Sequence, residues 1–173
     1  MKRVNLIVYL VLCVLFVILI ILVLLNRGDV ELRRALAENR EFQIRVEGEV
    51  ISTIGLQFLL DMEPQEFTAS YATSISAPRD VTMRGVELRL LLDALEIDLS
   101  NVNHFVVSGL DSYYTPLSID EVLIDENVYI CYSMDGEMMK SQSEGGVGPY
   151  MLVIRSDRFA QRWCKYIEAV DVR

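Results

Sequence analysis

Residues 6–25 form the longest apolar run of the chain, and this run contains no charged residue, proline or glycine. An α-helix of that length rises about 30 Å at about 1.5 Å per residue, which matches the hydrocarbon thickness of a bilayer. A long helix on the surface of a globular domain would carry a polar face, and this run has none. The pattern therefore predicts a transmembrane helix at residues 6–25, preceded by a short tail at residues 1–5.

A cleaved signal peptide is the alternative interpretation, because Lys2 and Arg3 precede the apolar run. The run exceeds the roughly 7–15 apolar residues of a signal peptide, and no small-residue cleavage motif follows it. We therefore expect an uncleaved anchor. Cys13 follows Leu12, not the small residue typical of a lipid attachment site, and we interpret it as an apolar residue of the helix.

The orientation of the expected anchor depends on its flanks. Basic residues occur on both sides of the run, so the positive-inside rule gives a weak signal. A very short amino-terminal tail favours the cytoplasmic side. We expect a single-pass protein of the cell membrane with a cytoplasmic tail and a carboxy-terminal domain outside the cytoplasm.

The periodicity changes after the apolar run. Residues 26–41 carry Leu32 and Leu36 at helical spacing, with Asp29 in the place of an N-cap, and predict a juxtamembrane helical spacer. From Phe42 onward, short runs of apolar and β-branched residues are separated by turn residues, which is typical of strands. The expected strands are residues 42–46, 50–51, 66–71, 81–83, 105–107, 113–115, 128–132, 137–139, 150–154 and 163–172.

Helices are few in the same region. Residues 86–95 place four leucines on one helical face, and residues 118–121 match a capping box that should start a short helix. A third short helix is expected at residues 56–62, a loop at 74–80 and a turn at 158–162. Because the strands occur in hairpins, such as the one predicted at Asp135-Gly136, residues 42–173 are expected to form one α+β domain.

The charge of the chain restricts its partners. The formal net charge is −9 with Lys2 and Arg3 included, so residues 26–173 carry −9 − 2 = −11. Nucleic-acid binding needs a basic surface, and this composition argues against it. The lipid bilayer, through residues 6–25, and a membrane or extracytoplasmic protein are the expected partners.

Metal and redox chemistry have little support from residue counts. Cys131 and Cys164 are the only cysteines beyond the apolar run, and both lie in strand-like apolar contexts that favour buried free thiols. His104 is the only histidine and is expected to begin a strand, so a zinc or haem site is not supported. The chain contains no G-x-S-x-G motif, which argues against a Ser-His-Asp enzyme.

Several segments, taken in order, resemble the molybdopterin-binding domain of the sulfite oxidase family. The resemblance covers roughly residues 42–172. The segments are 46–50 (VEGEV), 84–92 (RGVELRLLL), 108–113 (SGLDSY), 128–137 (VYICYSMDGE), 148–153 (GPYMLV) and 162–167 (RWCKYI).

The resemblance implies a fold that can hold a molybdenum pterin, with the metal bound by one protein thiolate from the segment after the second strand. Here that segment, residues 66–74, contains no cysteine. Cys131 and Cys164 stand where the family has apolar residues, and Met151 stands where its motif has Arg. A molybdenum-pterin cofactor is therefore doubtful, and no catalytic or metal-ligating residue is assigned.

Four groups of residues are weaker candidates for a site. Arg79 and Arg84 flank the strand before the main helix and could face a ligand pocket, although solvated arginines are the commoner case. One of Tyr113 and Tyr114 is expected to point inward and the other outward. A flexible connection is favoured over a phosphate-binding loop at residues 145–149. A solvated surface is favoured over a calcium site for Asp111, Asp120, Glu121, Asp125 and Glu126.

These observations give two hypotheses of different classes. The first is a membrane-anchored sulfite oxidase-like domain without the usual thiolate ligand, acting as a small-ligand or protein binding module. The alternative is a divergent molybdopterin-dependent oxidoreductase coupled to a membrane electron-transfer partner. A membrane-tethered assembly factor that uses the spacer helix is not separable from the first by sequence.

Overall fold

The computed structural model describes the backbone of residues 2–73, 76–158 and 160–173, and their side chains except those of residues 2–8, 25–29, 73 and 76. The chain divides into two compact units, Met1–Ala35 and Leu36–Arg173. The second unit contains every strand among the described residues and begins six residues before Phe42, because Leu36 is buried.

Helix α1 spans Lys2–Asn39 without interruption. The expected start of a separate spacer helix at Asp29 is therefore wrong, because the backbone is already helical there. No proline interrupts residues 26–39, and Gly28 alone costs a helix only about 1 kcal/mol. The ends of the predicted transmembrane run, residues 6–8 and 25, lie outside the described side chains. Within what is described, no helix combines the length and the hydropathy needed to cross a bilayer.

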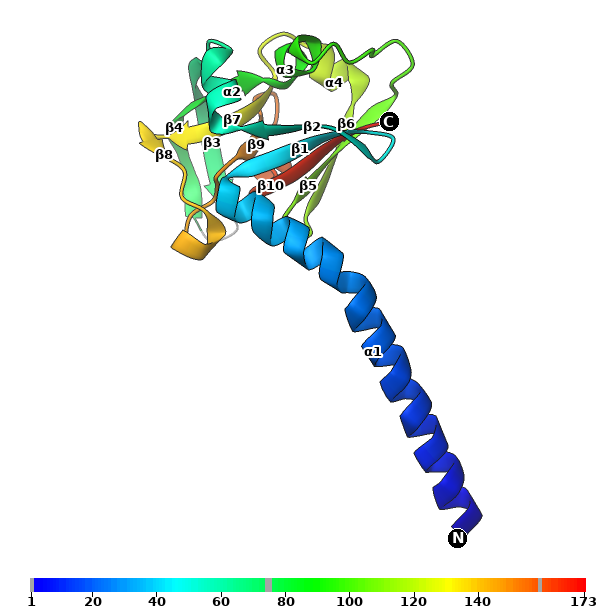
Figure 1. Cartoon of the computed structure of the whole chain (residues 1–173). Coiled ribbons are helices and arrows are strands. Elements are labelled where there is room, and N and C mark those ends of the chain that lie inside the picture. The colour runs from blue at the N-terminus through cyan, green and yellow to red at the C-terminus, as the bar shows by residue number, and fades with distance from the viewer. Residues whose placement is uncertain (1, 74–75, 159) are drawn as a thin grey trace. The chain divides into compact units, whose positions relative to one another are not determined.

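The domain contains two five-stranded sheets (Figure 1). The first sheet has the order β2-β1-β10-β5-β6, in which β1 and β10 are parallel and the other neighbours antiparallel. Its strands are β1 Glu41–Val46, β2 Glu49–Gly55, β5 His104–Gly109, β6 Tyr114–Ser118 and β10 Ile167–Val172. The expected hairpin of β5 and β6, and the start of a strand at His104, are confirmed.

The second sheet has the order β3-β4-β7-β8, and β9 also pairs with β7. Its strands are β3 Gln65–Thr73, β4 Ser76–Glu87, β7 Val128–Met134, β8 Glu137–Met138 and β9 Met151–Ile154. The hairpin at Asp135-Gly136 is confirmed, and both residues have positive φ, as the favoured two-residue hairpin turn requires.

Three short helices and two 3₁₀ turns complete the domain: α2 Leu56–Asp61, α3 Leu88–Ala94, α4 Ile119–Leu123, η1 Gln142–Glu144 and η2 Ala160–Arg162. The capping box of α4 is confirmed, since Ser118 Oγ accepts from Glu121 N and the Glu121 carboxylate accepts from Ser118 N. Helix α3 begins two residues later than expected, because Val86 and Glu87 still belong to β4.

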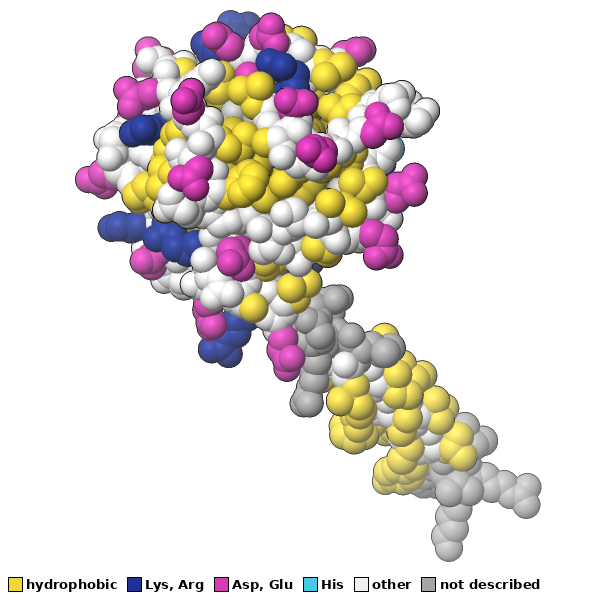
Figure 2. All heavy atoms as spheres, turned by 45° about the horizontal axis from the view of Figure 1, so that its top comes forward, with side chains coloured by type: hydrophobic (Ala, Val, Ile, Leu, Met, Phe, Trp, Pro, Cys, Tyr) yellow, Lys and Arg dark blue, Asp and Glu magenta, His cyan; other side chains and the backbone are white. Residues whose placement is uncertain are grey.

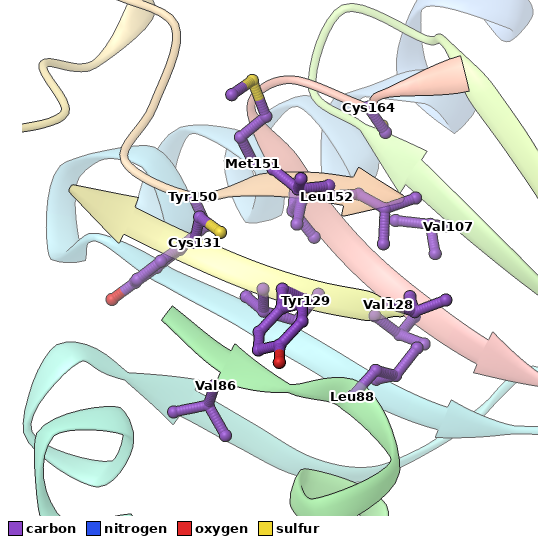
Figure 3. Close-up of a cluster of buried hydrophobic side chains, with 14 of the residues drawn as sticks. Val86, Leu88, Val107, Val128, Tyr129, Cys131, Tyr150, Met151, Leu152 and Cys164 are labelled. Atoms are coloured by element: carbon purple, nitrogen blue, oxygen red, sulfur yellow. The ribbon is translucent and has the colours of Figure 1, made fainter. Parts of the chain in front are cut away.

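One hydrophobic core joins the two sheets and α3. Leu88, Leu91 and Leu92 of α3 are fully buried, which confirms the predicted apolar face. Figure 3 shows β7 in the middle of this packing, with Val86 of β4 on one side and Leu152 of β9 on the other. Burial of this core is the main stabilising contribution to the fold.

Two expectations about the chain path are wrong. Residues 76–80 are strand rather than loop, while residues 74–75 lie outside the described residues. Pro78 is tolerated because it lies where the β3–β4 register shifts, so it interrupts no regular ladder pair. The closing strand begins at Ile167 rather than at Trp163, because Tyr166 has φ 54, which is incompatible with an extended strand.

Candidate functional site

The segment expected to supply a metal ligand forms β3, an edge strand of the second sheet that pairs with β4. Its side chains alternate: Phe67, Ala69 and Tyr71 are buried or half-buried, whereas Glu66, Thr68 and Ser70 are exposed. The described residues of β3 include hydroxyls but no thiol. Residue 74, the end of the expected ligand segment, lies outside the described residues.

The inward side of β3 is closed by aromatic packing. The Phe67 ring lies 4.4 Å from the ring of Tyr129, and the Tyr71 ring lies 5.8 Å from that of Trp163. Arg155 and Lys165 place their charges over the Phe67 and Tyr71 rings, at 5.1 Å and 5.8 Å from the centroids. These contacts stabilise β3 against the segment that follows β9.

The two thiols of the domain lie in its core. Cys131 and Cys164 are free and fully buried, as the sequence predicts. Burial raises the pKa of the Cys131 thiol well above its usual range, and burial followed by the nearby charge of Asp111 raises the pKa of Cys164 to about 12. A metal is bound by a thiolate, so neither buried, protonated thiol has the character of a ligand.

A bulge in β7 sets Tyr132 apart from its neighbours. Arg84 pairs with Ser133 and Gly85 with Cys131, so Tyr132 is the extra residue of β7 opposite β4. Bulges redirect side chains and are frequent beside functional sites. The Tyr132 hydroxyl is buried and has no hydrogen-bond partner among the described residues.

Arg84 pairs with Ser133, the residue of β7 that follows Tyr132. Burial raises the pKa of Tyr132, and the positive charge of Arg84 opposes that rise. Arg84 is exposed, and within the part of the chain that the structure describes it forms no ion pair, although Glu66 is its Cα partner on β3. An unpaired guanidinium and an unsatisfied hydroxyl are both donors of the kind that a small anion needs.

The sequence indicates Arg84 as a candidate for a ligand site but gives no indication of Tyr132. A tyrosine within an apolar strand is indistinguishable from a core residue in a single sequence, and a bulge has no dependable sequence signal. Arg79, the second candidate, is not joined with Arg84 in a pocket. Its Nη1 donates instead to Asp135 Oδ2 at 2.8 Å.

The tyrosine pair does not alternate as expected. Tyr113 and Tyr114 are both exposed, whereas the next residue, Thr115, is buried. Tyr113 lies before the start of β6, and its hydroxyl donates to the Gln161 carbonyl at 2.7 Å. The expectation that one of the two rings points into the core is therefore wrong.

The glycine-rich residues 145–149 have a packing role. A Cβ on Gly146 would collide with the Lys140 carbonyl, and one on Gly148 would collide with the side chain of Met139. These glycines allow close approach of two chain segments. The interpretation as a connection rather than a phosphate loop is consistent with these contacts.

The acidic candidates are divided among separate contacts. Glu121 bonds to Arg162, Asp125 to Arg89 and Glu126 to Arg155, and Asp111 accepts from the backbone of Tyr113. Among the described residues, no group of three or more His, Cys, Asp or Glu side chains could hold a metal ion.

The donor set does not fit a molybdenum pterin held in the manner that the resemblance implies. Its metal needs a thiolate, and the thiols of the domain are buried in the core. The phosphate of the pterin would be bound by basic side chains that have no carboxylate partner. Most arginines of the domain already pair with carboxylates and are not available for a phosphate. They are Arg45, Arg79, Arg89, Arg155, Arg162 and Arg173.

Comparisons with known proteins agree on one fold. A family model described as oxidoreductase molybdopterin binding domain matches residues 31–173. A solved structure, the sulfane dehydrogenase SoxCD from Paracoccus pantotrophus, is similar with a TM-score of 0.61 at 15% identity, covering 76% of this chain. The chain spans only 37% of that protein. No curated protein matches the sequence.

Proposed function

The chain belongs to the family of oxidoreductase molybdopterin binding domains, and from this premise we propose that it is a membrane-anchored, extracytoplasmic member that has lost the metal thiolate and acts as a binding module. The strand-rich α+β fold of the family is present, as the sequence predicted. Without the metal thiolate, the fold would keep its binding surfaces but not the usual metal centre.

The observation that carries the proposal is the position of the thiols. Cys131 and Cys164 are fully buried, and β3 offers only hydroxyls in its described part. A hydroxyl oxygen is a hard ligand and would give a metal centre of a different character from that of a soft thiolate. Sulfite oxidase-like chemistry is therefore not required by any residue of this domain.

A small anion is the ligand that the remaining donors suit best. Arg84 supplies an unpaired guanidinium and Tyr132 a buried, unsatisfied hydroxyl. Hydrogen bonds to an ionised group are about twice as strong as those between neutral groups, so these two donors would favour an oxyanion or a carboxylate. The ligand would complete the hydrogen bonding of Tyr132.

The membrane anchor is a second part of the proposal and rests on the apolar run at residues 6–25. Its length matches the hydrocarbon thickness of a bilayer. Anchoring would hold the binding module close to a partner in or near the membrane.

Molybdenum content tests the loss of the ligand. The full-length chain is purified from a host that synthesises the cofactor, and metal and pterin are measured by mass spectrometry and fluorescence. A thiolate-ligated protein of the same family, produced in that host, is the control and should contain both. We expect neither above background in this chain, and one molybdenum per chain would overturn the proposal.

The side of the membrane is tested with a Ser143→Cys variant in intact cells. Ser143 is exposed, Cys131 and Cys164 are buried and shielded from reagent, and Cys13 lies within the proposed membrane span, so the natural chain is the matched control. A membrane-impermeant maleimide should label the variant and not the natural chain. Labelling that requires cell lysis would place the domain on the cytoplasmic side.

A divergent oxidoreductase coupled to a membrane electron-transfer partner is the second candidate, and family membership is the observation that favours it. It requires an oxygen ligand or no protein ligand at the metal. The same molybdenum measurement separates the two candidates, because only the oxidoreductase needs a stoichiometric metal.

A further inference from the structure

A groove of about 410 Å³ opens between α3, the loop that follows it and the end of α4. Its volume is within the range of small-molecule and peptide-side-chain pockets. None of its lining residues belongs to β3 or β4, so it is separate from the site around Arg84. The residues that line it are Arg89, Asp93, Ile97, Asp98, Leu99 and Leu123.

One wall of the groove is apolar. Ile97 and Leu99 are half-buried and pack against the hydrophobic core. Leu123 is 47% exposed, and its neighbour Ile124 is 54% exposed. Val122 of helix α4 is buried, whereas Leu123 and the following C-cap residue Ile124 remain in solvent.

The other wall is acidic. Asp98 accepts a hydrogen bond from Ser100 N at 2.9 Å, and this contact lowers its pKa. The Asp93 carboxylate is exposed, and among the described residues no hydrogen bond or ion pair engages it.

Arg89 does not neutralise these two carboxylates, because its charge is already engaged. Its Nη2 lies 2.8 Å from Asp125 Oδ1, and its Nε lies 3.4 Å from Glu87 Oε1. Figure 2 looks onto the side of the domain that carries α2, α3 and α4 in Figure 1, and shows hydrophobic side chains in its centre with acidic and basic side chains around them.

We propose that this groove, lined by Ile97, Leu99 and Leu123 and bordered by Asp93 and Asp98, binds a basic amphipathic helix of a partner protein. Apolar side chains of the helix would cover Leu123, and its lysines or arginines would meet the carboxylates. Helix-in-groove recognition uses this combination of an apolar stripe and complementary charge.

Charge argues against the other simple occupants. A second copy would bring the formal charge of −11 of its residues 26–173 against the acidic border. An anionic lipid surface would be repelled for the same reason. The inference does not depend on the molybdenum content of the chain, so it fails or survives separately from the proposed function.

The test uses the full-length chain in nanodiscs of zwitterionic lipid and a fluorescent, photo-crosslinkable peptide of leucine and lysine with helical periodicity. Empty nanodiscs provide the background, and a leucine and glutamate peptide of equal length is the charge control. We expect saturable binding of the basic peptide alone, with crosslinks in residues 89–99 and 119–125. Binding of both peptides, or crosslinks confined to other segments, would overturn the proposal.

Matched substitutions locate the binding. Leu123→Ser and Asp93→Lys should each weaken peptide binding by about tenfold or more, which corresponds to about 1.4 kcal/mol. Ile51→Ser, at an exposed residue of β2, and Asp80→Lys, at an exposed residue of β4, should change it less than about twofold. Equal losses in groove and control variants would contradict the inference, as would self-association of the natural chain that Leu123→Ser abolishes.

Discussion

Arg162 Nη2 lies 2.7 Å from Glu121 Oε1 and joins the 3₁₀ turn η2 to the first turn of α4. The same guanidinium also donates to both carboxylate oxygens of Asp157. Glu121 is at the same time the closing residue of the capping box, through Ser118. One arginine therefore connects a helix start with the loop that carries Trp163 and Cys164.

Replacing Arg162 should lower the stability of the domain. Arg162→Gln removes hydrogen bonds to two carboxylates, and partial solvent exposure reduces the effect to about 1 kcal/mol in the free energy of unfolding. Urea titration followed by tryptophan fluorescence measures it, because the single Trp163 is adjacent. Arg79→Gln is the control, since the Arg79–Asp135 pair is exposed on both sides, and it should leave the unfolding midpoint unchanged.

The Glu121 contact should also make stability depend on pH. The Arg162 hydrogen bond is the largest cause that lowers the pKa of Glu121 below its ordinary 4.5. A carboxylate with a lowered folded-state pKa stabilises the native state above its unfolded-state pKa and loses that contribution as the pH falls through the folded-state value.

The difference in unfolding free energy between the natural chain and Glu121→Gln should therefore be constant near neutral pH and shrink below pH 4.5. Urea titrations at a series of pH values measure this difference. A difference that grows as the pH falls would contradict the assignment of Glu121 as an ionised partner of Arg162.

Gly85 should be intolerant of any side chain. A Cβ at this position would lie 2.6 Å from Cys131 Cα and would also collide with the Ile130 carbonyl, both on β7. Gly85→Ala should destabilise the domain by about 1–3 kcal/mol, because the backbone of two central strands must separate. Thermal unfolding measures the loss.

Gly55 gives the matched control for Gly85. A Cβ there would meet only Glu41 Cγ at 3.8 Å, an ordinary contact, and its φ of −108 suits any residue. Gly55→Ala should be neutral or stabilise by up to about 1 kcal/mol, since it reduces the entropy of the unfolded chain. Equal losses at the two positions would show that close packing is not the reason for Gly85.

Local sequence patterns determine most of the elements of the fold. The apolar face of Leu88, Leu91 and Leu92 requires a helix packed on a core, and the Ser118 capping box starts α4 where the sequence places it. The turn residues Asp135 and Gly136 define a hairpin in the same way. These features depend on neighbours within a few residues, so a single sequence is sufficient to find them.

The candidate site depends on contacts between distant segments, and here sequence patterns fail. Pro78 suggested a loop, but pairing with β3 made the segment a strand. Tyr132 becomes unusual only through the bulge opposite Arg84 and Gly85, which joins segments about fifty residues apart in the chain. The sequence ranks Arg84 above Arg79 as a ligand candidate, but only the structure shows that Asp135 engages Arg79.

Two tyrosines on β7 should respond in opposite ways to the same substitution. Tyr129 Oη donates to Gln65 Oε1 at 2.7 Å, whereas the Tyr132 hydroxyl has no partner among the described residues. Tyr129→Phe should cost about 1 kcal/mol of unfolding free energy, the net value of a hydrogen bond. Tyr132→Phe should be neutral or stabilising by up to about 1 kcal/mol, because an unsatisfied buried hydroxyl is removed.

The Tyr129→Phe and Tyr132→Phe variants also test whether Tyr132 and Arg84 bind an anion. If they do, sodium sulfate at constant ionic strength should raise the unfolding temperature of the natural chain and of Tyr129→Phe, since a ligand that binds only the native state stabilises it. The rise should be smaller in Tyr132→Phe and in Arg84→Gln. An equal rise in all four proteins would indicate a general salt effect and would leave Tyr132 as an unsatisfied core residue without a ligand.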